Sequence, residues 1–60
     1  MKRHTMEIFT RNGAEIYGRL YQNYKTCDEV LIRDSFNLNA LRAYAENHKI
    51  RYNVVTIERQ

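Results

Sequence analysis

The dipeptide Asn12-Gly13, which stands between two apolar stretches, limits the possible folds of this chain more than any other feature. Asn-Gly in this setting is a strong signal of a β-hairpin, because a type I′ turn needs two residues with positive φ. The segment also fits the start of a helix, since Asn12 followed three residues later by Glu15 is a capping pattern. The two interpretations give the side chains of residues 13–25 different faces.

A helix over residues 13–25 would contain Gly13 and Gly18, each of which costs about 1 kcal/mol relative to alanine. A strand gives Gly18 a purpose, because a glycine inside a strand permits a sharp bend. We therefore expect a hairpin, in which alternate side chains point to opposite faces. The expected inward residues are Met6, Ile8, Ile16, Gly18 and Leu20, and the expected outward residues are Phe9, Tyr17, Arg19 and Tyr21.

The stretch FNLNALRAYAENH, residues 36–48, is the clearest helix in the sequence, because its apolar residues recur at helical spacing. Either Ser35 or Asn37 can cap its start. Asn47 offers an end, since asparagine tolerates the left-handed conformation found at helix C-termini. The predicted core positions of this helix are Leu38, Leu41 and Ala45.

Segments rich in β-branched and aromatic residues flank this helix at residues 29–34 and 50–59. The sequence thus predicts an α+β fold, a small β-meander followed by one helix and a final strand. A β-α-β-α-β fold with a parallel sheet is the alternative if residues 13–25 are helical. Residues 1–60 form one small domain in either case, and residues 1–5 could be a flexible arm.

Three features follow one another in the first half of the chain: the turn at Asn12-Gly13, the segment Gly18-Arg19-Leu20, and a strand at Val30–Asp34. An N-G turn, a bent G-x-L strand and a strand ending near an aspartate resemble the first half of an Sm-like domain, and small SH3-like barrels share them. The resemblance implies a strand, a turn and a bent strand. This chain has Gln22–Lys25 where that family carries an RNA-contacting D-x-x-M-N loop, and it turns helical where the family continues with two strands. The resemblance therefore transfers no functional residue.

The small size of the chain predicts self-association. A chain of 60 residues buries only about 60% of the surface that its unfolded form exposes. The final strand, Tyr52–Ile57, has apolar residues on both faces, and such a strand needs cover on both. One short helix covers one face, so we expect a homodimer formed through this strand or through its face.

Composition narrows the class of partner. The chain has ten basic and seven acidic residues, hence a formal net charge of +3, which mildly favours an anionic partner. Cys27 is the single cysteine, which excludes an internal disulfide and suggests a reducing compartment. No apolar run approaches the ~20 residues of a membrane span. We expect a cytoplasmic protein that does not associate with membranes.

The sequence carries no pattern of catalytic or metal-binding residues. His4, Cys27 and His48 lack the close spacing that metal ligands need, so we expect no metal and no cofactor. His48 stands at the predicted end of the helix, where a capping or surface role is the simpler interpretation. Together with Lys49 and Arg51 it forms a short basic cluster, and a small ribonuclease that uses this cluster is a remote third hypothesis.

The outward row of the hairpin is the strongest candidate surface. Alternating aromatic and basic side chains suit the stacking of unpaired bases with a phosphate contact between them. Tyrosine-rich surfaces also serve protein interfaces. We therefore expect a non-enzymatic regulator that binds single-stranded nucleic acid. The alternative is a small inhibitor or adaptor that docks on a larger host protein, as a phage or mobile-element accessory protein would. The candidate binding residues are Phe9, Tyr17, Arg19, Tyr21, His48, Lys49 and Arg51.

Overall fold

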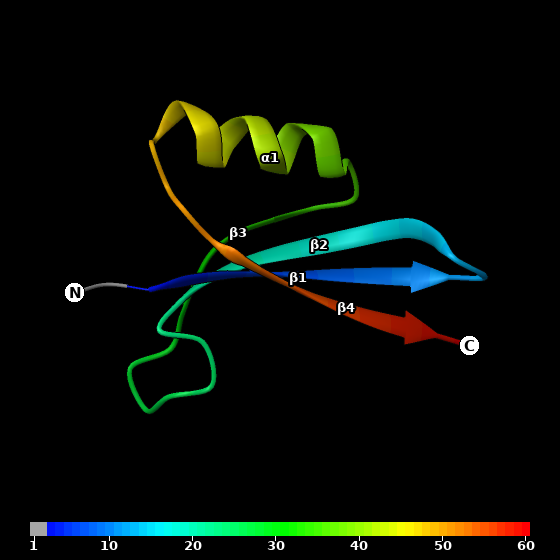
Figure 1. Ribbon diagram of the computed structural model, residues 1–60, viewed down its shortest axis with the longest axis horizontal. Coiled ribbons are helices and arrows are strands. Elements are labelled where there is room, and N and C mark those ends of the chain that lie inside the picture. The colour runs from blue at the N-terminus through cyan, green and yellow to red at the C-terminus, as the bar shows by residue number, and fades with distance from the viewer. Residues whose placement is uncertain (1–2) are drawn as a thin grey trace.

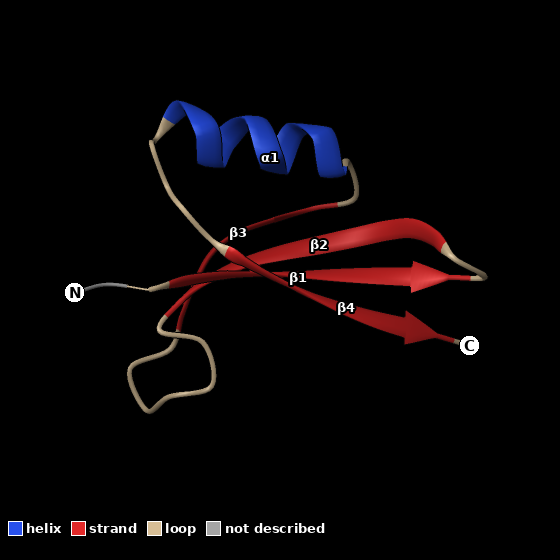
Figure 2. Ribbon diagram, in the orientation of Figure 1, coloured by secondary structure: helices blue, strands red, loops and turns tan. Residues whose placement is uncertain are grey.

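A computed structural model describes residues 3–60 as one mixed sheet with a single helix (Figure 1). The elements in chain order are β1 (His4–Arg11), β2 (Ala14–Gln22), β3 (Val30–Ser35), α1 (Leu38–Asn47) and β4 (Asn53–Arg59). The strand order is β3-β2-β1-β4, with β4 parallel to β1 and the other neighbours antiparallel. The α+β class predicted from the sequence is confirmed, and α1 lies on one side of the sheet only (Figure 2).

The turn between β1 and β2 settles the conformation of residues 13–25. Asn12 and Gly13 have φ angles of 53° and 80°, as a type I′ turn requires, and the two strands pair antiparallel. The hairpin is confirmed and the helical alternative is wrong. The Glu58 carboxylate from β4 accepts hydrogen bonds from the Asn12 backbone N–H at 2.8 Å and from the Thr10 hydroxyl at 2.6 Å. The turn is therefore tied to the neighbouring parallel strand.

The core lies between the sheet and α1, and Gly18 sets how closely the two layers approach. A Cβ atom at Gly18 would lie 2.6 Å from Leu38 Cδ1 and 2.8 Å from Leu41 Cδ2. The absence of a side chain thus lets α1 pack directly on β2, whereas the sequence suggested a bend at this glycine. The buried hydrophobic side chains are Met6, Ile8, Leu20, Leu38, Leu41 and Ala45, as predicted.

Ile16 does not join this core, contrary to the prediction. Phe9 pairs with Tyr17 but Thr10 pairs with Glu15, so Ile16 is the extra residue of a β-bulge. A bulge changes the alternation of side chains. Glu15 consequently points toward the helix, and its carboxylate forms an ion pair with Arg42 of α1. Ile16 is half-buried and lies outside the core cluster.

The start of α1 matches one of the two predicted caps, and its end differs from the prediction. Asn37 is the N-cap, and its side-chain oxygen accepts a hydrogen bond from a first-turn N–H at 3.2 Å. Phe36 therefore stays outside the helix with 83% of its side chain exposed. At the other end Lys49, not Asn47, takes the left-handed conformation, with φ of 56°. The following N–H, of Ile50, donates back to a carbonyl of the last turn, as in a Schellman motif.

The predicted arm at residues 1–5 overlaps the first strand. His4 pairs with Gln22, and Thr5 pairs with Tyr21 and is buried. These two residues are thus part of the sheet rather than of an arm, while residues 1 and 2 lie outside the described residues. Over residues 3–60, no helix has the length and apolar character needed to cross a membrane.

Candidate functional site

The face of the sheet opposite α1, called here the open face, carries the predicted aromatic and basic row. Phe9 pairs with Tyr17 across β1 and β2, and cross-strand partners share a face. Tyr17, Arg19 and Tyr21 alternate along β2 and therefore point the same way. All four side chains are half-buried. The structure thus brings together four of the seven predicted binding residues.

The rings of the open face pack against one another. The centroids of Phe9 and Tyr17 are 5.9 Å apart, and those of Tyr17 and Phe36 are 4.8 Å apart. A second pair, Tyr21 and Tyr24, has centroids 5.3 Å apart. The open face therefore carries an aromatic layer of two separate ring clusters, one that extends from the hairpin to the loop before α1 and one at Tyr21 and Tyr24.

Arg19 is held inside this layer. Its guanidinium carbon lies 5.5 Å from the Phe9 centroid and 5.4 Å from the Tyr17 centroid, within cation–π range. Its Nη1 donates to the Tyr21 hydroxyl at 3.4 Å, while its Nε is shielded from solvent and has no hydrogen-bond partner among the described residues. Hydrogen bonding to the Tyr17 and Tyr21 hydroxyls raises the pKa of Arg19, so its charge persists. Arg19 thus organises the rings, whereas the sequence suggested that it extends toward a phosphate.

Two carboxylates engage the tyrosine hydroxyls. The Tyr17 hydroxyl donates to Asp34 of β3, and the Tyr24 hydroxyl donates to Glu7 of β1. The bond to Glu7 raises the pKa of Tyr24 to about 12, because it favours the protonated phenol. Since these two hydroxyls already have partners, they are not free to bind a ligand.

A hollow of about 300 Å³, called here the aromatic hollow, opens at the hairpin end of the open face. It is lined by Phe9, Arg11, Ile16, Tyr17, Arg19, Phe36 and Arg59. Three rings and three guanidinium groups thus surround one space, and no carboxylate among the described residues lines it. Arg59 reaches the hollow from β4, with its guanidinium carbon 5.4 Å from the Phe9 centroid.

Four residues of this hollow were not among the predicted binding residues. Arg59 joins the site because β4 pairs in parallel with β1, which places it opposite Arg11. Ile16 joins through the bulge, and Phe36 joins because the cap at Asn37 leaves it outside the helix. The period-2 pattern of the last strand, which places Arg59 on the same face as Ile57, is the one sequence signal that pointed to this set.

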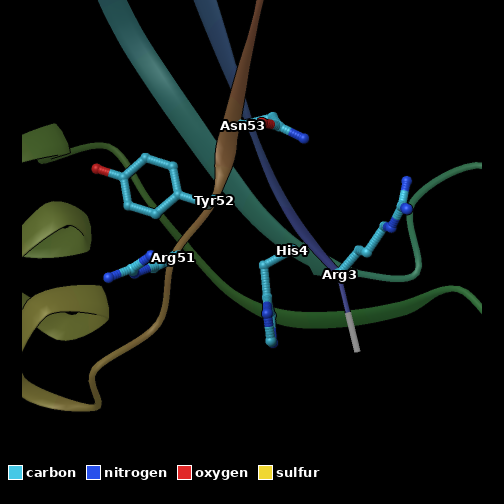
Figure 3. A pocket seen from close by; sticks show the side chains of 5 residues that line it. All are labelled: Arg3, His4, Arg51, Tyr52 and Asn53. Atoms are coloured by element: carbon cyan, nitrogen blue, oxygen red, sulfur yellow. The ribbon is translucent and has the colours of Figure 1, made fainter. Parts of the chain in front are cut away.

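The basic residues after α1 lie apart from the aromatic hollow. The His48 ring packs on Tyr44, with centroids 4.2 Å apart, and Lys49 forms the left-handed helix end. Arg51 instead lines a second space of about 270 Å³, called here the basic hollow. Figure 3 shows its five lining residues, which are Arg3, His4, Arg51, Tyr52 and Asn53.

Within residues 3–60, no group of three histidine, cysteine, aspartate or glutamate side chains is placed to hold a metal ion. The chain matches no family model, no curated protein and no solved structure. The resemblance of the first three strands to an Sm-like domain stays a prediction. What the site can do therefore has to be inferred from its own geometry.

Proposed function

We propose that this protein binds single-stranded nucleic acid at the aromatic hollow and acts without catalysing a reaction. The observation that supports the proposal is the composition of the hollow, in which three rings and three guanidinium groups meet without a carboxylate. Proteins that bind unpaired strands combine stacking rings with cations that contact the backbone. A volume of about 300 Å³ is at the low end for ligand pockets and suits one nucleotide.

The residues of the hollow divide into two roles. Phe9, Tyr17 and Phe36 offer ring faces on which a base can stack. Arg11 and Arg59 are exposed and can reach a phosphate, while Arg19 stays between the rings. Arginine suits this role because its planar group can bind two phosphate oxygens at once.

The first test is the affinity for a fluorescently labelled oligothymidylate or oligouridylate, measured by anisotropy at low salt. Phe36→Ala removes an exposed ring from the edge of the hollow, and each stacked ring is worth about 1–3 kcal/mol, or roughly 5-fold to 150-fold in affinity. Val54→Ala is the matched control, because Val54 is 54% exposed on the other face of the sheet. If the wild type binds no single- or double-stranded oligonucleotide, the proposal is wrong.

A second pair of variants separates the two tyrosines of the predicted row. Tyr17 lines the hollow, whereas Tyr21 packs on Tyr24 outside it. Tyr17→Ser is therefore expected to weaken binding much more than Tyr21→Ser, and the double variant abolishes it. Arg59→Ala lowers affinity and reduces the slope of log affinity against log salt by about one. Equal effects of the two tyrosine variants would contradict the placement of the base in the hollow.

The alternative is an inhibitor or adaptor that docks on a host protein. The exposed apolar side chains of the edge strand β3, Val30 and Leu31, favour it, because an unpaired strand edge can receive a partner strand. Nucleic-acid binding weakens steeply with added salt, and docking through apolar side chains does not. A pull-down with and without nuclease therefore separates the two functions.

Two further proposals accompany this function. The outer strand β4 exposes Val54, which supports the homodimer, and sedimentation at micromolar concentration tests it. A clean monomer would exclude that dimer. Cys27 is exposed and unpaired, which supports a reducing, cytoplasmic compartment.

A further inference from the structure

The basic hollow has the chemistry of a second phosphate site. Two arginines, a histidine, a tyrosine and an asparagine line it, and no carboxylate among the described residues does so. Arg3 and Arg51 are both exposed, and neither forms an ion pair within residues 3–60. In Figure 3 the Arg3 and Arg51 side chains point away from each other, one on each side of His4, so each can contact a different phosphate. A guanidinium group can bind two phosphate oxygens at once. Asn53 and Tyr52, which also line the hollow, carry an amide and a hydroxyl that can donate further hydrogen bonds.

The two hollows lie at opposite ends of the same pair of parallel strands. The basic hollow is formed where β1 and β4 begin, at His4 and Asn53, and the aromatic hollow is formed where they end, at Arg11 and Arg59. β4 has seven residues, so its ends are about 20 Å apart at about 3.3 Å per residue. At the rise of about 3.4 Å per nucleotide of a stacked strand, this distance corresponds to about six nucleotides, and a more extended strand covers it with fewer.

The open face between the two hollows favours a path along β4. On this face β4 presents Val55 and Ile57, which are half-buried and apolar, between Asn53 and Arg59. The acidic residues of the open face belong to other strands, since Glu7 is on β1 and bonds to a tyrosine, and Asp34 is on β3. A polyanion therefore meets the least repulsion above β4.

We infer that a bound single strand runs along β4, with a base in the aromatic hollow and, up to about six nucleotides away, two phosphates that contact Arg3 and Arg51 separately. The inference rests on the proposed nucleic-acid binding and adds to it a second contact and a path along the sheet. A free nucleotide fills one hollow only, so affinity rises once the strand is long enough to reach both.

The test compares oligothymidylates of about two and about eight nucleotides, of which the shorter cannot reach both hollows and the longer exceeds the stacked span of about six. The wild type is expected to bind the longer strand more tightly and with a steeper salt dependence. The double variant Arg3→Ala, Arg51→Ala is expected to lose about two units of salt slope for the longer strand and none for the shorter. The matched control, Lys25→Ala with Lys49→Ala, also removes two charges but touches neither hollow, so its slope for the longer strand stays near that of the wild type.

The possible outcomes separate this inference from the proposed function. If the short and long strands bind alike and the arginine variant changes both equally, the second site is refuted while binding at the aromatic hollow stands. If the lysine control loses as much slope as the arginine variant, the effect is one of overall charge, and the second site is again refuted. If neither strand binds, both the function and the inference are wrong.

Discussion

The two faces of the sheet use the same strands in opposite ways. On the covered face, Met6 and Leu20 are fully buried beneath α1, and Gly18 provides a flat surface for the helix. On the open face, the intervening residues Tyr17 and Arg19 are large, half-buried and in contact with each other and with neighbouring rings. Burial thus stabilises the fold from one side. The other side holds its aromatic groups through ring contacts and hydrogen bonds, and it leaves Phe36 largely exposed.

This difference separates stability from binding along the sequence. Because strand side chains alternate, a substitution at one position of β2 is expected to affect the core, and a substitution at the next position the site. Stability is small in a chain of this size, so the loss of one core contact has a large effect. Substitutions on the covered face are therefore expected to change stability, and substitutions on the open face to change binding.

Leu41→Ala is expected to have the largest effect. Leu41 is 0% exposed at the centre of the covered face, and truncation of a buried leucine costs about 2–5 kcal/mol. A loss of this size unfolds much of so small a domain, as thermal denaturation followed by circular dichroism will show. Leu31→Ala is the control, because Leu31 is 47% exposed and its loss leaves the midpoint nearly unchanged. An unchanged midpoint in Leu41→Ala would mean that the core lies elsewhere.

Gly18→Val is expected to have the next largest effect. Its side chain would meet Leu38 and Leu41 at less than van der Waals distance, and overpacking of a core costs about 1–3 kcal/mol. Valine favours strands more than glycine does, so strand propensity alone predicts the opposite sign. Gly18→Ala should have a smaller effect in the same direction. A higher unfolding midpoint for either variant would contradict the close packing of α1 on β2.

Gly13→Val is expected to destabilise the hairpin shared by both faces. Gly13 has φ of 80° with open space around it, so the cost is conformational and amounts to about 1–2 kcal/mol. Gly13→Asn is the matched control, because asparagine tolerates positive φ and should cost less. Equal destabilisation by the two substitutions would indicate that backbone conformation is not the cause.

The covered face was largely predictable from the sequence, because its signals are local. The Asn12-Gly13 turn and the period of Leu38, Leu41 and Ala45 each act over a few residues, and the structure confirms them. The parallel pairing of β4 with β1 has no such local signal. It joins residues about 48 positions apart, such as Thr10 and Glu58, and depends on how the connection through α1 crosses the sheet.

The candidate site was predictable only where its residues are brought together by a local pattern. Strand alternation alone brings Tyr17, Arg19 and Tyr21 to one face. The aromatic hollow also needs Arg59, which arrives through long-range pairing, and Ile16, which arrives through a bulge whose register the sequence does not reveal. The predicted basic cluster of His48, Lys49 and Arg51 does not form one site. The chain turns sharply at Lys49, and only Arg51 lines a hollow.

Glu58→Gln is expected to have the smallest effect, and that effect depends on pH. The Thr10 hydroxyl, and then the backbone N–H groups of Asn12 and Gly13, donate to the Glu58 carboxylate and lower its pKa below the ordinary 4.5. A pKa lowered by folding adds stability above the ordinary pKa, and this stability is lost as the pH falls through the folded value. The contribution is modest because the carboxylate is exposed to solvent. Denaturation of wild type and variant at about pH 7 and about pH 3 should show a gap in stability that shrinks in acid. A gap that stays constant between the two pH values would mean that the Glu58 charge does not hold the turn.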